Sequence, residues 1–281
     1  MCAEKGLASP VILYKPVAEP VELRKMVKDG IYALSGQYAI LVQWLHPGLA
    51  RGSIEHSDFA YRILHRLKPT SRFLNATVYG TPEEKARIFS VIHKKHATVK
   101  GEDYFADDPE LRKWTAATLF MSLLVVHEPF FGKVSTEKKE ALFRESSIYT
   151  TSLRMPTEMW PATLDEFWEY WNHNIATLPI TQWAKNLVHS LLYPKNAPLW
   201  LHPQWPIARL LTAQWLPERL RVGYGLPSTK VRRGAYKAVK TYISMVYPLV
   251  PQAVGTYPHK YGMKDMRKAV RRIEVSGSWV K

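Results

Sequence analysis

Polar side chains capable of ligand or proton chemistry recur between residues 43 and 101, inside sequence that is otherwise apolar and helix-like. Several are histidines, and a buried imidazole needs a partner because leaving water is unfavourable for it. Three separate helix-like segments bring these side chains onto or beside apolar faces. They are Gln43, His46, His56, Arg66, Thr70, His93 and His96. We interpret the set as a site for a buried cofactor ligated by histidine, with haem as the first candidate.

His93 and His96 stand one helical turn apart, so their side chains project from about the same face of a helix. Two histidines at this spacing can both meet a metal, or one can be the ligand and the other its neighbour. The alternative is a pair of partly exposed histidines, because Lys94 and Lys95 separate them. Both interpretations stand at this point.

Arg66 and Thr70 share a face if one helix runs through both, but Pro69 disfavours helix at the residue before it. A break there would place Arg66 at the end of one helix and Thr70 at the start of the next. Either way a cation and a hydroxyl lie close together, which suits a haem propionate or a dioxygen-derived oxyanion. The alternative is a surface arginine beside a capping threonine.

The segment before that pair contains a candidate proton-transfer group. We expect His46 with Pro47 and Gly48 to end the first long helix, and His56 with Ser57 and Asp58 to cap and open the next. Glu55, just before this cap, is the best-placed carboxylate for moving a proton. The chain contains no GxSxG, GxxxxGK[ST], HExxH or GxGxxG motif, which weakens hydrolase and nucleotide-enzyme hypotheses.

Helix-start signals dominate the rest of the chain, and no alternating apolar run ends in an Asn-Gly or Asp-Gly turn. Capping patterns occur at Thr81-Pro82-Glu83-Glu84, at Asp108-Pro109-Glu110 and at Thr163-x-x-Glu166. The longest apolar run, residues 114–126, is too short to span a bilayer and predicts a buried helix. The expected fold is all-α, with a helical core around a cofactor and a carboxyl-terminal helical extension.

Composition and charge limit the remaining choices. With one cysteine, Cys2, the chain has no intrachain disulfide, and with no basic-then-apolar start it shows no signal peptide, so we expect a cytoplasmic protein. Residues 221–281 carry thirteen Lys and Arg against two acidic residues. They form either a surface for an anionic membrane or nucleic acid, or a solvated basic face. We expect a core at 1–192, a Pro- and Trp-rich connection at 193–227, and basic helices packed on the core at 228–281.

Six short motifs in this order resemble the rubber oxygenase (latex clearing protein) and mycophenolic-acid-pathway oxygenase superfamily. The likeness covers roughly residues 38–175. The motifs are Gln43-x-x-His46-Pro47, His56-Ser57-Asp58-Phe59, Arg66-x-x-x-Thr70, Tyr79-Gly80, His96-x-x-Val99-x-Gly101, and Asp108-Pro109-Glu110-Leu111 with Trp114.

This resemblance implies a globin-like helical core that holds haem b. His96 would be the axial ligand of the iron, with His93 as its neighbour and His127 as a further histidine on the haem side. Arg66 and Thr70 would match the distal-side pair, and Glu55 the carboxylate proposed as a base.

The chain also departs from the family pattern. Rubber oxygenases carry a lysine directly before the threonine, where this chain has Pro69, and Lys68 is one residue out of register. A distal site closed by lysine is therefore not expected, nor is polyisoprene as the substrate. The fungal oxygenases carry an amino-terminal membrane anchor that is not apparent in this sequence.

The leading hypothesis is a haem-dependent oxygenase or oxidase that uses dioxygen on a hydrophobic small molecule. Oxidative cleavage of a carbon-carbon double bond in secondary metabolism is its specific form. A second hypothesis is a dehydratase or cyclase in which Gln43, Glu55, His56 and Arg66 act as acid-base groups. A third is a basic protein that binds lipid or nucleic acid through residues 221–281. We expect peripheral membrane contact there rather than nucleic-acid binding, because no zinc-finger or RNA-binding signature accompanies the charge.

Overall fold

The computed structural model describes residues 14–56, 63–194 and 204–278, with the backbone alone at 63–66. The described residues are 75% helical and form no β-strand, only one isolated bridge between Lys100 and Phe105. The all-α prediction is confirmed. The helices are α1 (Glu22–Val27), η1 (Gly30–Leu34), α2 (Ser35–Gln43), α3 (Pro47–Glu55), α4 (Ile63–Tyr79), α5 (Pro82–His96), α6 (Pro109–Phe131), α7 (Thr136–Glu145), α8 (Ser147–Ser152), η2 (Thr157–Met159), α9 (Leu164–Thr177), α10 (Gln182–Leu192), α11 (Trp205–Trp215), α12 (Glu218–Gly223), α13 (Lys230–Val246), η4 (Tyr247–Leu249), α14 (Gln252–Gly255) and α15 (Tyr257–Ser276).

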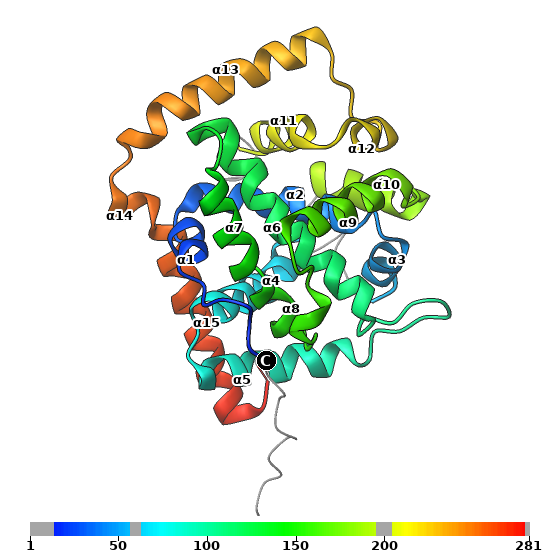
Figure 1. The fold of residues 1–281 in the computed structure, drawn as a ribbon, viewed down its shortest axis with the longest axis vertical. Coiled ribbons are helices and arrows are strands. Elements are labelled where there is room, and N and C mark those ends of the chain that lie inside the picture. Colours follow the sequence, from blue (N-terminus) through cyan, green and yellow to red (C-terminus); the bar gives the residue numbers. More distant parts are fainter. Residues whose placement is uncertain (1–13, 57–62, 195–203, 279–281) are drawn as a thin grey trace, which may run out of the picture.

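Helix α6 runs through the middle of the molecule, and the other helices are arranged around it (Figure 1). Asp108 caps its first turn through the Glu110 N–H, as the sequence predicts. Helices α2, α8 and α13 pack against it, and its Trp114 ring stacks on Trp171 of α9 at 5.1 Å. By length and composition α6 is long and apolar enough to cross a membrane, but 61% of that window is buried inside the protein. It is the core helix that the apolar run predicts.

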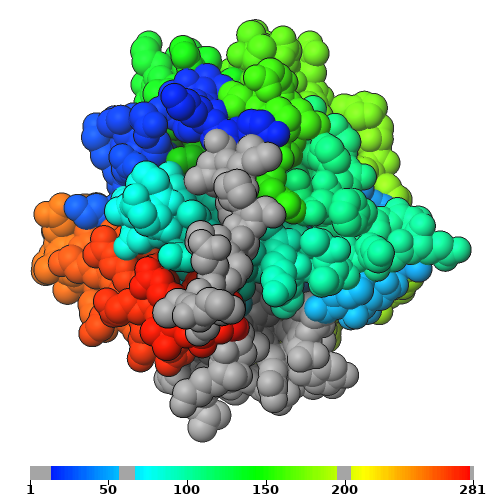
Figure 2. Space-filling view, turned by 90° about the horizontal axis from the view of Figure 1, so that it is seen from below, coloured from blue at the N-terminus to red at the C-terminus, as the bar shows by residue number. Residues whose placement is uncertain are grey.

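A hairpin of α4 and α5 packs against the carboxyl-terminal helix α15. Gly80 makes the turn, where a Cβ would meet the Ala76 carbonyl oxygen at 2.6 Å, and Thr81 starts α5 with the predicted capping box. Figure 2 shows the red residues of α15 lying beside the cyan residues of the hairpin. Arg72 of α4 donates to Asp265 of α15 at 2.6 Å in this seam, so a helix near the carboxyl terminus holds the hairpin in place.

Two local predictions about helix ends are wrong. His46 does not end a helix: α2 ends at Gln43, and His46 accepts the Gly48 N–H as the amino-terminal cap of α3. Proline at the first helical position fits a start as well as a stop, and here the start prevails. Glu55 therefore ends α3 instead of preceding a cap, and His56 follows it. Residues 57–62, including Ser57 and Asp58, lie outside the described residues.

Proline 69 does not break α4, which runs from Ile63 to Tyr79. A proline in a helix removes one backbone hydrogen bond and clashes with the preceding turn. Tertiary contacts on either side offset this cost here. Lys68 and Arg72 both reach Asp265, and the Phe73 ring packs on Phe89 at 5.2 Å.

Basic helices of the carboxyl-terminal region contact the core at two places. Helix α13 packs on α6 and α11, and α15 packs on α4 and α5. Helices α11 and α12 fall within residues 193–227, of which 195–203 lie outside the described part. The division at 192 and 227 stays a prediction, as do a globin-like core and cytoplasmic placement.

The Arg72–Asp265 pair should contribute strongly to stability. Burial would raise the pKa of Asp265, but the Arg72 hydrogen bond and charge, with help from Lys68, outweigh it and lower the pKa. Asp265→Asn removes the carboxylate beside a guanidinium that is 8% exposed. We expect this to lower the free energy of unfolding by about 2–4 kcal/mol at neutral pH, measured by urea denaturation.

The pH dependence gives this prediction its sign. A depressed folded-state pKa stabilises above the ordinary value near 3.8, and that stability is lost as pH falls through the folded value. The difference between the two proteins should therefore shrink in acid. Glu274→Gln, exposed on the same helix, is the control and should change stability by less than about 0.5 kcal/mol. Equal losses in both variants would contradict the assignment.

Candidate functional site

The open end of the α4–α5 hairpin collects the residues that the sequence marks for a cofactor. Phe73 and Phe89 meet across the hairpin, and each helix rises about 1.5 Å per residue. Seven residues further towards the open end, position 66 and His96 therefore stand at one level. Thr70 lies about one turn inside that level. The Arg66 side chain is outside the described residues, while His96 is half-buried at the last residue of α5.

His93, one turn before His96, is a buried neutral imidazole. Its Nε2 lies 3.0 Å from the Ser152 carbonyl oxygen, to which it donates as the Nε2–H tautomer. Burial first, and then the positive charges of Arg154 and Arg112, lower the pKa of His93 to about 4, although the Ser152 bond opposes this. His93 thus stays uncharged at neutral pH and orients this end of α5 against α8.

A carboxylate shared by two arginines lies beside His93. Asp107, just before α6, pairs with Arg112 of α6 and with Arg154, which follows α8, the latter at 2.6 Å. Burial lowers the pKa of Arg112 to about 10, and Arg154 adds to the effect. The Nε atoms of both arginines are buried without a hydrogen-bond partner in the described part of the chain. With His93 neutral, two cations face one anion, so the cluster keeps an excess positive charge.

The sequence analysis does not single out this arginine pair. Arg112 carries a signal that could have been used, because it is a cation just before the long apolar run of this helix. Arg154 carries none: it is a non-glycine residue with a positive φ of 60°, and only the tertiary fold brings it to Asp107. Such backbone conformations are uncommon and often mark functional sites.

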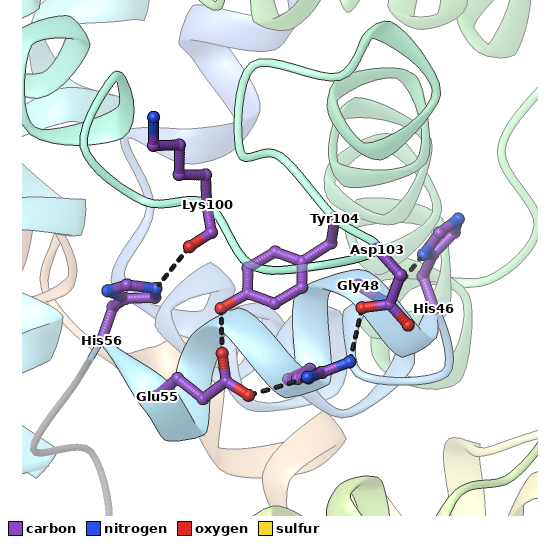
Figure 3. A network of polar contacts seen from close by, with 8 residues as sticks. His46, Gly48, Glu55, His56, Lys100, Asp103 and Tyr104 are labelled. Atoms are coloured by element: carbon purple, nitrogen blue, oxygen red, sulfur yellow. Dashed lines mark hydrogen bonds and ion pairs between the residues drawn. The ribbon is translucent and has the colours of Figure 1, made fainter.

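On the other side of the loop at 97–108, Tyr104 locks that loop onto α3 (Figure 3). Cβ atoms added at Gly48 or Gly52 would lie 3.1–3.2 Å from Tyr104, and one added at Gly101 would overlap its ring. Glycines at these places let the loop and the helix approach closely. His56 adds a contact between its Nε2 and the Lys100 carbonyl oxygen at 3.3 Å.

Glu55 serves this lock with both of its oxygens. Tyr104 donates its hydroxyl to Oε2 at 2.5 Å, and Arg51 donates to Oε1 at 2.7 Å while also reaching Asp103. These two hydrogen bonds, with that of Tyr104 the larger, lower the pKa of Glu55. A carboxylate held ionised in this way is a weaker base than a free one. The proton-transfer role expected for Glu55 stays a prediction, and the geometry gives it a positioning role.

A pocket of about 160 Å³ adjoins the lock, lined by His46, Arg51, Asp103, Tyr104, Trp183 and four neighbouring residues. It is smaller than the roughly 300–1,000 Å³ that small-molecule sites usually span. Burial lowers the pKa of His46, against the opposing charges of Asp108 and Glu110. This pocket suits water or a small ion better than a bulky hydrophobic substrate.

Two predicted site residues lie away from the hairpin end. Gln43 donates to the Thr118 hydroxyl on α6 at 3.0 Å, in the α2–α6 packing. His127 pairs through Nδ1 with the Tyr32 hydroxyl at 2.5 Å, and burial first, then Lys138, lower its pKa. Along α6, His127 is about 22 Å from Arg112, which neighbours His93. We do not expect one bound cofactor to contact both His127 and His93.

The described residues contain no group of three or more His, Cys, Asp or Glu that could hold a metal ion among themselves. A haem iron differs from such a site because one protein ligand can hold it. The candidate residues that the structure brings together are His93, His96 and Thr70, all within about one helical turn of the level of position 66. Glu55 and His56 stand across the loop.

The Tyr104 lock predicts a measurable change at Glu55. In Tyr104→Phe the pKa of Glu55 should rise towards its ordinary value of 4.5, because the largest cause of its lowering is gone. Carbon-13 NMR titration of the carboxyl groups measures this. Gly101→Ala should act in the same direction by displacing the ring. Glu83, whose lowered pKa rests on Thr81 and its own backbone, is the internal reference. If the pKa of Glu55 were unchanged in both variants, the assignment of the Tyr104–Glu55 lock would be refuted.

Residues 24–245 match the family model described as "ER-bound oxygenase mpaB/B'/Rubber oxygenase, catalytic domain". Among curated relatives, the uncharacterized protein Rv2237 of Mycobacterium tuberculosis is 22% identical over 248 residues, which cover 83% of this chain and 95% of the relative. The uncharacterized protein Mb2261 of Mycobacterium bovis matches to the same extent. No solved structure matches. Because the family model spans most of its length, the chain belongs to the oxygenase family of ER-bound mpaB/B' and rubber oxygenase catalytic domains.

Proposed function

We propose that the protein is a haem b-dependent oxygenase or oxidase that uses dioxygen to oxidise a hydrophobic small molecule. Membership of the oxygenase family supports oxidation as the general reaction. The observation that carries the haem assignment is the position of His96, half-buried at the open end of the hairpin and level with position 66. Oxidative cleavage of a carbon-carbon double bond is the specific reaction that we propose.

The donors at this end fit a haem in their chemistry. Imidazole is a common protein ligand of haem iron, and His96 would supply it. A haem also brings two carboxylates, and the Asp107 cluster offers an excess positive charge with the buried Nε atoms of Arg112 and Arg154 still able to donate. When bound, the haem would supply the one-electron and dioxygen chemistry that amino-acid side chains lack.

The remaining residues would position and shield that site. His93, neutral and donating to Ser152, would fix the end of α5 and so orient His96. Thr70 would present a hydroxyl from the facing helix. The Tyr104–Glu55 lock would hold the loop that follows His96 in one conformation.

Lys68 supports a site that lysine does not close. Its Nζ lies 3.4 Å from Asp265, on the side of α4 that faces α15. Thr70 is two residues on, about 200° around the helix, so Lys68 lies on the opposite side of α4 from Thr70. We therefore propose that this member differs from rubber oxygenases in having no lysine over the distal side.

Replacing the proposed ligand tests the assignment directly. Protein from haem-supplemented cells should show a Soret band and contain iron, and His96→Ala should lose most of both, because the iron would lose its protein ligand. The measurement is the absorption spectrum together with iron content per chain. His173→Ala, an exposed histidine on α9, is the matched control and should retain the parent spectrum.

Two outcomes would overturn the proposal. A well-folded parent that is colourless and takes up no added haemin would exclude haem chemistry. A Soret band unchanged in His96→Ala would keep the haem but reject His96 as its ligand.

The pair of Arg112 and Arg154 predicts an effect on haem affinity that does not depend on the iron ligand His96. Arg154→Gln should weaken haem binding about tenfold to a hundredfold while keeping the Soret position, because a charge-assisted hydrogen bond is lost but the axial ligand stays. Titration of apoprotein with haemin measures the affinity. Arg87→Gln, exposed on α5, is the control and should bind like the parent. Equal affinity in all three proteins would remove the cluster from the haem site.

A further inference from the structure

Helix α13 carries an apolar row that the fold does not use. Its inner side, with Tyr236, Val239 and Ile243, packs partly buried against the core. Positions 231, 235, 238, 242 and 245 recur every three or four residues and so share one outer side of the helix, and position 249 follows in η4. All six are exposed, and the large ones are Val231 at 81%, Tyr242 at 66%, Met245 at 69% and Leu249 at 79%.

The apolar surface continues beyond α13 along the same margin of the molecule. Val254 of α14 and Tyr257 at the start of α15 are also more than half exposed. Figure 1 shows α13 running along the outside of the molecule, with α14 following at its end. Large exposed apolar patches of this kind mark interaction surfaces.

The charged side chains that this segment itself contributes are all cations, although Asp29 of the core contacts Tyr247 of η4. Residues 219–264 contain nine Lys and Arg and no Asp or Glu. Arg232 and Arg233 donate to backbone carbonyls just before the helix, while Lys230, Lys237 and Lys240 extend from the side away from the apolar row. None of these five cations forms a salt bridge within the described residues. The outward surface of α13 is thus apolar on one side and basic on the other.

We propose that α13, with η4 and α14, docks the protein on an anionic lipid bilayer. The apolar row would enter the boundary between headgroups and acyl chains, as the apolar face of an interfacial helix does. The lysines would reach the lipid phosphates, because their long stems can follow an apolar surface while the ammonium groups stay in water. Cations combined with an apolar row match this partner in both respects.

Charge argues against the other occupants of such a surface. A second copy of the chain would bring two acid-free basic strips together, on molecules that each carry a net charge of +15. Nucleic acid would satisfy the lysines but would leave Val231, Met245 and Leu249 without an apolar partner. An anionic bilayer satisfies both features.

Vesicle flotation with the full chain tests the proposal. The protein should float with vesicles of phosphatidylcholine and phosphatidylglycerol at low salt, bind phosphatidylcholine alone weakly, and dissociate as salt rises. Lys237→Ala with Lys240→Ala should weaken binding roughly twenty-five-fold, taking about fivefold for each lysine at an anionic surface. Met245→Glu with Leu249→Glu should abolish binding even at low salt.

Matched variants elsewhere on the surface make the test specific. Val275→Glu changes a residue that is 89% exposed at the far end of α15. Lys94→Ala with Lys185→Ala removes two exposed lysines, one from α5 and one from α10. Both should bind as the parent does, and circular dichroism should show every variant folded. Binding that is absent, insensitive to anionic lipid, or equally weakened by the control variants would overturn the proposal. The proposal would also be overturned if Met245→Glu with Leu249→Glu changed only the self-association of the protein. The same holds if the parent bound an RNA homopolymer through Lys237 and Lys240 but bound no vesicle.

Discussion

Helix α6 is apolar around nearly its whole circumference, so neighbouring helices must cover it from every side. This requirement places α2, α8, α9 and α13 around it and leaves polar chemistry to its two ends. Arg112 stands at the first end and His127 at the last, roughly 22 Å apart. The polar clusters of the protein are therefore separate, and the hairpin end, rather than the Tyr32–His127 pair, adjoins the residues expected to hold a cofactor.

Polar contacts add to the apolar packing of α5 in setting the position of His96. The loop that follows it is anchored at Asp107 by arginines from two other segments, and at Tyr104 by Glu55 of α3. One turn earlier, His93 is tied to the Ser152 carbonyl oxygen. A side chain held by such contacts keeps its orientation only while every partner is in place, because each buried polar group is costly to leave unsatisfied. If His96 ligates haem as proposed, changes outside direct contact with the haem would also lower its affinity.

Local signals were enough to predict where α5, α6 and α9 start, since the caps at Thr81, Asp108 and Thr163 depend on residues within one turn. They failed at His46, because a proline and glycine after a polar residue are compatible with both a stop and a start. The pairing of Lys68 with Asp265 could not be predicted from the sequence, because the two residues are 197 positions apart. No local pattern indicates where α15 packs. The same holds for Arg154 and Asp107. The role of Glu55 needed the tertiary structure too, because only there does Tyr104 meet it.

The inner and outer sides of α13 have different roles. Its inner row is explained by the need to cover α6, and losing it would expose the core. Its outer row contributes nothing to that packing, and exposed Met245 and Leu249 would by themselves promote aggregation. The excess of basic residues in this segment favours repulsion between copies of the chain. Folding does not require the outer apolar row of α13, and the basic charge beside it disfavours contact with a second copy of the chain. A partner that is both apolar and anionic best explains this surface. A bilayer that also dissolves hydrophobic substrates would be such a partner.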